Sequence, residues 1–163
     1  MNKNDIKDMI KDYVNKNYPQ KVQNYYDELK KIRVAKLKKY SDVTLLNNGL
    51  LWQDDKSMKD LKYSALSSIR YCKSLHLATK NDWRLPTYDE LLKLVNYFRF
   101  DPAKIDEIQH IRSNRYWTIS PDASDVSANW YIDFKYGQTG TALRGLKYNV
   151  RCVRDMEAEG ELF

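Results

Sequence analysis

Asp82-Trp83-Arg84-Leu85-Pro86-Thr87 joins two amphipathic segments in the middle of the 163-residue chain, and the rest of the chain is organised around it. An extended segment points Trp83 and Leu85 to one face and the Arg84 guanidinium to the other. Pro86 stops the stretch from continuing as a helix and disfavours helix at the residue before it. We therefore expect a corner braced by hydrogen bonds from Arg84, and the alternative is an arginine that binds an anion.

The corner also begins the helix that follows it. Thr87 and Glu90 have the spacing of a capping box, immediately before a run of apolar residues. Capping and pairing with arginine account for the carboxylates of Asp82, Asp89 and Glu90, so we assign none of them to catalysis. We expect the helix to extend to about Tyr97.

A hairpin and a helix are predicted before the corner. Residues 43–46 and 50–52 have the composition of strands and flank an Asn-Asn-Gly turn. Residues 61–77 carry an apolar stripe at helical spacing, with Cys72 on it. Neither histidine of the chain has a second histidine or cysteine at metal-ligand spacing, so we expect no metal site.

The second half of the chain is predicted to be mostly β. Strands are expected at residues 116–120, 129–134 and 148–154. Residues 137–145 hold three of the five glycines and are expected to form a loop. In the last strand, alternation places Arg151 on the face opposite Val150 and Cys152.

The first 40 residues differ in charge from the rest. They contain 11 Lys and Arg against 5 Asp and Glu, whereas residues 41–163 contain 17 of each. We expect a basic helical arm at 1–40, a domain at 41–155 and an acidic flexible tail at 156–163. A short heptad-like seam runs through Val22, Tyr25, Leu29 and Ile32. The arm is therefore either packed on its own domain or a homo-oligomerisation segment.

Composition bounds the partners and the compartment. Acidic residues interleave with the lysines of the arm and no nucleic-acid-reading motif accompanies them, so we expect no nucleic-acid partner. We expect no membrane span and no signal peptide within this sequence. Cys72 and Cys152 each lie on an apolar face. They are either joined by a disulfide or are two buried thiols of a cytoplasmic protein.

Several motifs together resemble the Lcl C-terminal domain family, first named from a bacterial collagen-like adhesin. They cover residues 48–54, 71–72, 82–87, 90–91, 116–118, 130–134 and 150–154. Their most distinctive residues are Trp52, Asp82, Trp83, Arg84, Pro86, Glu90, Trp117, Trp130 and Arg151. The resemblance extends over about residues 43–155.

The resemblance implies an α+β, C-type-lectin-like fold in which two helices flank a small, mostly antiparallel sheet with long loops. The architecture is related to formylglycine-generating enzymes and to the variable proteins of diversity-generating retroelements. The resemblance further implies a Cys72–Cys152 disulfide and export to the periplasm, the cell surface or the medium.

Function is also an expectation from this resemblance. The family's founding member binds sulfated polysaccharide, and residues 112–154 carry seven basic residues against three acidic ones. We expect a non-enzymatic recognition module that binds a glycan, such as a sulfated polyanion, or a protein surface, through the loops of its C-terminal half. The candidate ligand-binding residues are Tyr131, Lys135, Tyr136, Gln138, Arg144, Lys147 and Tyr148.

Two alternatives stay open. One is an assembly protein that displays the domain on an oligomeric arm, and the other is a protein binder of the hypervariable type. We find no nucleophile–base pair, metal spacing or phosphate loop, and therefore expect neither an enzyme nor a cofactor. The Glu-Pro-Asn, Gln-Pro-Asp and Trp-Asn-Asp triplets of calcium-dependent lectins are absent from the sequence.

Overall fold

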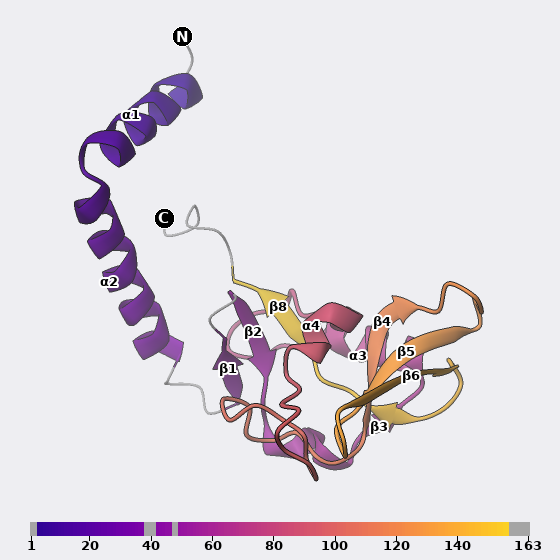
Figure 1. The fold of residues 1–163 in the computed structure, drawn as a ribbon. Helices are drawn as coiled ribbons and strands as arrows, with labels where there is room; N and C mark the ends of the chain where they lie inside the picture. The colour runs from indigo at the N-terminus through magenta and orange to yellow at the C-terminus, as the bar shows by residue number, and fades with distance from the viewer. Residues whose placement is uncertain (1–2, 38–41, 47–48, 157–163) are drawn as a thin grey trace. The chain divides into compact units, whose positions relative to one another are not determined.

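The computed structural model describes residues 3–37, 42–46 and 49–156, and the chain divides into two compact units, residues 1–39 and 40–163 (Figure 1). The first unit consists of α1 (Lys3–Asn17) and α2 (Pro19–Leu37). Backbone hydrogen bonds from Tyr18 to Val14 and from Val22 to Tyr18 continue across the junction. The bend between the helices follows from Pro19, which has no backbone N–H and whose ring crowds the preceding turn.

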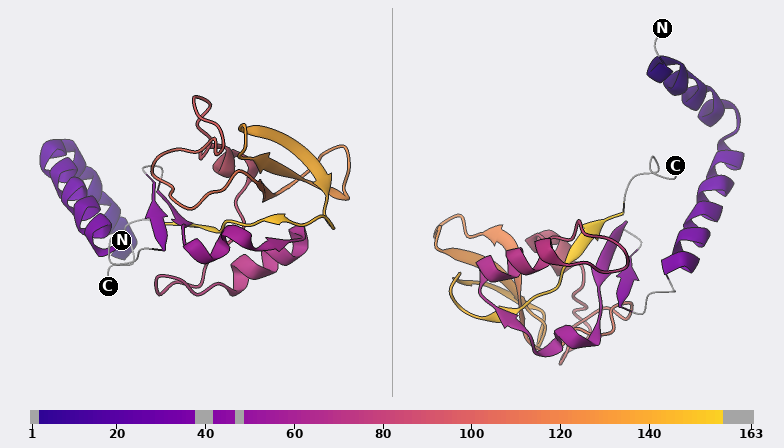
Figure 2. Two further views of the ribbon diagram at one scale, coloured as in Figure 1. Left: turned by 90° about the horizontal axis from the view of Figure 1, so that it is seen from below. Right: turned by 180° about the vertical axis from the view of Figure 1, so that it is seen from behind.

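The second unit contains two sheets, as the views of Figures 1 and 2 show. The smaller sheet has the strand order β1 (Val43–Leu45), β2 (Leu50–Gln53) and β8 (Val153–Asp155). The larger sheet has the order β3 (Lys62–Tyr63), β7 (Tyr148–Asn149), β4 (Arg115–Pro121), β5 (Ala128–Asp133) and β6 (Gln138–Leu143). Neighbouring strands are antiparallel except β4 and β7. Together with its helices, this unit makes the protein a mixed α+β structure.

The helices of the second unit are shorter than their apolar patterns predict. A 3₁₀ turn, η1 (Lys56–Asp60), precedes α3 (Ala65–Ser74) and α4 (Tyr88–Leu92). The predicted helix at 61–77 begins late because Ser64 caps it, its hydroxyl accepting the Ser67 N–H. The helix expected to reach Tyr97 ends at Leu92, after which the chain forms turns.

The two strands of the predicted hairpin and the first two predicted strands of the C-terminal half are confirmed, whereas residues 47–48 of the predicted turn lie outside the described residues. Two other predictions are wrong. Residues 137–145 do not form one loop, because β6 pairs with β5 over six residues. Residues 148–154 do not form one strand. β7 belongs to the larger sheet and β8 to the smaller, so Arg151 lies in the crossing between sheets and is buried with its neighbours. The tail from 157 onward lies outside the described residues.

The corner at 82–87 connects the smaller sheet to α4. Arg84 exchanges backbone hydrogen bonds of 2.9 Å with Val153 in β8. Its guanidinium donates to both carboxylate oxygens of Glu90 at 2.8 Å and to Asp155 at 3.1 and 3.3 Å. The capping box of Thr87 and Glu90 is confirmed. Because the guanidinium donates to Glu90, the pKa of this carboxyl lies below its ordinary value.

The core of the second unit lies between its sheets and α4. It is formed by Leu50, Trp52, Leu91, Leu94, Val95, Ala103, Ile108, Ile111, Tyr116, Ile132, Phe134 and Val153. A disulfide joins Cys72 on α3 to Cys152, which lies between β7 and β8, so it links the helix to the crossing between the two sheets. None of the helices in the described part of the chain is long and apolar enough to span a membrane.

Candidate binding site

One face of the larger sheet carries stacked aromatic side chains. Register pairs Trp117 with Tyr131, and alternation places them on the same face. The Tyr148 ring lies 4.6 Å from that of Trp117 and 5.2 Å from that of Tyr131. Trp117 is fully buried and donates its indole N–H to the Tyr63 carbonyl at 2.9 Å, whereas both tyrosines are half-buried. We call these three side chains the aromatic face.

Arg115 is fixed above the aromatic face. Its guanidinium carbon lies 5.0 Å from the centre of the Tyr131 ring and 5.6 Å from that of Tyr148. It donates hydrogen bonds to the Tyr148 hydroxyl at 3.3 Å and to the Asp133 carboxylate at 3.2 Å, and these raise the pKa of Arg115. The cation is therefore held in place while its side chain stays half exposed.

Gly140 leaves the space that Tyr131 occupies. A Cβ atom at this glycine would lie 2.6 Å from the Tyr131 hydroxyl oxygen. Any larger residue on this part of β6 would push the ring off the sheet. Packing of the Tyr131 ring thus explains why a glycine lies inside this strand, where glycine is otherwise unfavourable.

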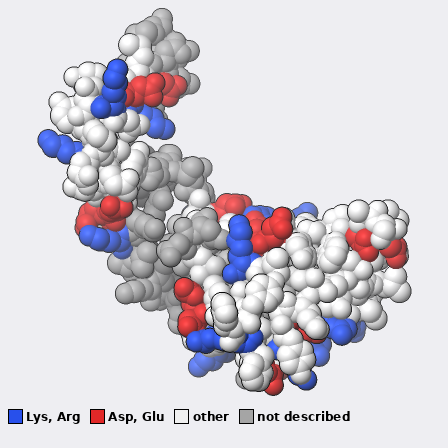
Figure 3. Space-filling view, viewed as in Figure 1, with Lys and Arg blue, Asp and Glu red and all other residues white. Residues whose placement is uncertain are grey.

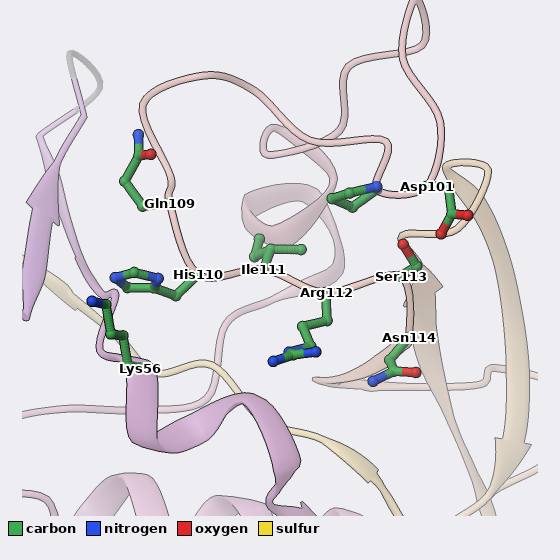
Figure 4. Close-up of a pocket in the computed structure, with 9 residues that line it drawn as sticks. Lys56, Asp101, Gln109, His110, Ile111, Arg112, Ser113 and Asn114 are labelled. Atoms are coloured by element: carbon green, nitrogen blue, oxygen red, sulfur yellow. The ribbon is translucent and has the colours of Figure 1, made fainter.

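Two hollows share Ser113 and Asn114 in their linings, and the smaller one adjoins the aromatic face through Tyr148. The smaller, of about 250 Å³, is lined on its charged side by Lys62, Arg115, Asp133, Lys135 and Lys147. The larger, of about 640 Å³, is lined by Lys56, Asp101, Pro102, Gln109, His110, Ile111 and Arg112 as well (Figure 4). We call the two together the basic groove.

The groove has a strong excess of positive charge. Its lining contains six basic residues, Lys56, Lys62, Arg112, Arg115, Lys135 and Lys147, against two acidic ones, Asp101 and Asp133. In the view of Figure 3, Lys and Arg groups gather along the lower edge of the second unit among fewer Asp and Glu groups. An anionic ligand is therefore the chemistry that this surface favours.

A buried ion pair positions the wall of the larger hollow. Arg151 donates to Asp54 at 2.9 Å, and their side chains are only 1% and 3% exposed. The Asp54 carboxylate also accepts the backbone N–H groups of Gln109 and His110, both at 2.8 Å. Arg151 in turn donates to the carbonyls of Gln53 and His110 at 2.6 Å. The loop that lines the groove is thus fixed from behind by both charges.

The part of the chain that contains this site matches a known family. A family model described as the Lcl C-terminal domain covers residues 42–154, which include the whole lining of the groove and both sheets except the last residue of β8. The chain belongs to the Lcl C-terminal domain family. A search of curated proteins found no match.

Membership in the Lcl C-terminal domain family suggests a module of the extracellular or surface type. The residues that carried the resemblance are mainly in the interior of this domain. Trp52, Trp83 and Trp117 are buried, and Trp130 packs edge-on against Tyr88. Pro86 is buried and its carbonyl accepts the Ile119 N–H.

Asp82 pairs with a second buried arginine of the Lcl C-terminal domain. Arg154 donates to its two carboxylate oxygens at 2.6 and 2.8 Å. These hydrogen bonds hold the pKa of Asp82 below its ordinary value. Unlike Asp54, Asp82 is half exposed, so water also solvates this carboxylate.

The predicted ligand-binding residues of this Lcl C-terminal domain do not form one cluster. Lys135, Lys147 and Tyr148 line the smaller hollow, and Tyr131 lies beside Tyr148. Tyr136 is exposed next to them, with the Lys135 ammonium 5.2 Å from its ring centre.

Gln138 and Arg144 lie at opposite ends of β6. Gln138 pairs with Asp133, and Arg144 follows the other end of the strand. Six residues of strand separate these ends by about 17 Å. Arg144 is engaged there by Asn129, to whose side-chain oxygen its Nε donates at 2.6 Å. Arg144 therefore lies apart from the basic groove.

Four basic groove residues escaped the sequence prediction: Lys56, Lys62, Arg112 and Arg115. Arg115 could have been found, because it stands two positions before Trp117 and so shares its face in a strand. Lys62 could not have been predicted from the sequence, since it reaches the groove only through the pairing of β3 with β7.

Proposed function

We propose that the domain is a non-enzymatic recognition module with a C-type-lectin-like arrangement that binds an anionic glycan, such as a sulfated polysaccharide, in the basic groove. The observation that carries the proposal is the excess of six basic residues over two acidic ones along two adjoining hollows. Lysine and arginine are the side chains that pair with sulfate.

The aromatic face supports the same ligand class. Tyr131 and Tyr148 are half-buried and stacked, and Arg115 is held over both rings. Sugar rings have apolar faces that pack on aromatic side chains, while their sulfates lie at the ring edge, within reach of the neighbouring cations. Because Arg115 and both rings are already fixed, little side-chain freedom is lost when a ligand binds.

The proposal includes export, because disulfides persist in oxidising compartments. The Cys72–Cys152 bond would form in the periplasm, at the cell surface or in the medium, where glycans of this kind occur. A role in adhesion follows if the glycan belongs to another cell.

Reversing two groove charges tests the glycan proposal. We expect Lys62→Glu with Lys147→Glu to weaken binding to heparin by at least about tenfold at low salt, since each reversal turns an attraction into a repulsion. Binding is measured by titration calorimetry across a salt series, and binding of the parent protein should weaken as salt rises.

The matched control is Arg70→Glu with Lys73→Glu, which changes the net charge equally at two exposed positions of α3 that do not line the groove. This control should retain most of the affinity. Equal losses in both variants, or binding of the parent that does not depend on salt, would contradict the proposal. Binding of a protein ligand in place of heparin would favour the protein-surface alternative.

A second candidate function, display of the domain on an oligomeric arm, is favoured by an apolar stripe on the first unit. A hollow of about 630 Å³ follows α1 and α2 across their bend. Its apolar lining is Ile10, Val14, Tyr18, Val22, Tyr25 and Tyr26. The stretch 8–28 has three lysines against four acidic residues, so two copies would not repel each other strongly along it.

Light scattering tests this assembly. We expect the parent to be oligomeric and Ile10→Ser with Val14→Ser to be monomeric, because these exposed side chains gain burial only from another copy. Asp12→Ser with Lys16→Ser, on the opposite side of α1, should leave the oligomer intact. A parent that is monomeric at all concentrations rules this function out. Leu29 and Ile32 of the predicted seam have side chains outside the described part of the structure.

A further inference from the structure

Exposed aromatic side chains gather on two loops of the second unit. Phe98 is 100% exposed and Phe100 76%, and Tyr97 beside them is also exposed. Tyr136, in the turn between β5 and β6, is exposed as well. We call these four side chains the aromatic tip. The tip forms part of neither the core nor the aromatic face.

The base of the aromatic tip is well fixed. The Asp101 N–H donates to the Lys135 carbonyl at 2.8 Å, which joins the two loops. A Cβ atom at Gly137 would lie 3.4 Å from the Tyr97 ring, so the loops pack closely there. Arg99 pairs with Asp106 across the base, at 3.0 Å. The exposure of the two phenylalanines is therefore a property of a structured loop.

The loop projects from the surface. Figure 2 (left) shows the chain near residue 100 as a narrow protrusion, and in Figure 4 it rises away from Asp101. Full exposure of Phe98 adds nothing to folding, because the hydrophobic effect stabilises only surface that is removed from water. Contiguous exposed aromatic side chains mark an interaction site.

The aromatic tip rises from the rim of the basic groove. Asp101, which directly follows the loop, and Pro102 line the larger hollow, and Lys135, which directly precedes Tyr136, lines the smaller one. Apolar and cationic groups are thus presented on neighbouring parts of one surface. A partner that satisfies both has negative charge on its surface and apolar material directly beneath.

An anionic lipid bilayer has this layered chemistry. Its headgroup phosphates attract lysine and arginine, and aromatic side chains favour the region just below them. A projecting tip can enter a fluid interface without a preformed pocket. Apolar insertion alone gives marginal attachment, which becomes stable when a basic patch adds a second signal.

We propose that the aromatic tip inserts into the interface of an anionic lipid bilayer while the cations of the basic groove contact the lipid phosphates. The proposal does not require the groove to bind a glycan. It depends on Phe98 and Phe100, which the glycan proposal does not use.

Vesicle co-sedimentation tests the proposal with the full chain. The parent should bind vesicles of phosphatidylglycerol and phosphatidylcholine and bind pure phosphatidylcholine much less. Phe98→Ser with Phe100→Ser should lower the partition coefficient by about tenfold or more, since two apolar side chains no longer leave water. Val126→Ser with Leu143→Ser removes two exposed apolar groups elsewhere and should bind like the parent.

Fluorescence gives a second readout. Phe98→Trp should show blue-shifted emission on these vesicles relative to the parent, and brominated lipids should quench the added signal. The Phe98→Ser, Phe100→Ser variant should keep its affinity for heparin, so failure of either proposal is recognisable by itself. Parent protein that does not bind anionic vesicles, or a tip variant that binds as well as the parent, would overturn the membrane proposal. If the parent bound no vesicles and the Phe98→Ser, Phe100→Ser variant lost self-association, the partner of the aromatic tip would instead be a second copy of the chain.

Discussion

Replacing Arg151 by methionine is expected to lower the free energy of unfolding by about 3–5 kcal/mol, because it leaves the Asp54 carboxylate buried without its partner. Asp54 is 3% exposed and still bound to the backbone N–H groups of Gln109 and His110. The carbonyls of Gln53 and His110 would each lose a charged donor at 2.6 Å. Such carbonyls are costly to leave unpaired in the interior.

Chemical denaturation followed by tryptophan fluorescence measures this loss. Arg154→Met is the matched control, because Arg154 is equally buried but its partner Asp82 is half exposed and stays hydrated. We expect the control to lose clearly less stability than Arg151→Met. If the two losses were equal, burial of the carboxylate would not explain the effect. Arg151→Met should also loosen the loop at 109–112, which lines the larger hollow.

The corner could be predicted from sequence because its signals are local. Thr87 and Glu90 are three positions apart, and Pro86 acts on its immediate neighbour, so short-range rules suffice. Arg151 could not be placed in this way. Alternation assumes that a strand stays in one sheet, whereas the chain leaves the larger sheet after Asn149 and enters the smaller one at Val153.

The prediction that the glycine-rich residues 137–145 form a loop was wrong for a related reason. Glycine predicts turns, and Gly137 does adopt a positive φ of 73°. Gly140, however, lies inside β6, where a neighbouring strand's Tyr131 fills the space of a side chain. The requirement for glycine at position 140 arises only after the strands have paired, so no local sequence pattern can predict it.

The sequence indicated the region of the chain that contains the candidate site, but it did not identify all the residues that line it. The positive balance of residues 112–154 pointed to the half of the chain that contributes Lys135 and Lys147 to the groove. Lys56 and Lys62 lie well before residues 112–154 in the sequence and reach the groove only through the fold. Arg144 was predicted to bind the ligand because of its charge, but the length of β6 separates it from the basic groove.

Opening the disulfide is expected to cost about 4 kcal/mol in the free energy of unfolding, since the bond closes a loop with a sequence separation of 80 residues. Cys72→Ala with Cys152→Ala is the suitable variant, because both sulfurs are buried and alanine adds no polar group there. Denaturant unfolding of the oxidised parent and the variant gives the difference, and reductant should leave the variant unchanged.

The single variants decide whether loop closure is the cause. Either Cys72→Ala or Cys152→Ala alone opens the whole loop, so each should lose nearly as much stability as the double variant. Losses that instead add up from the two singles would assign the effect to local packing around each sulfur. The backbone of Cys152 also exchanges hydrogen bonds with Gln53, through the Gln53 N–H and its side-chain oxygen. These contacts need no disulfide, and they predict that the opened domain still folds, with the crossing between its sheets destabilised.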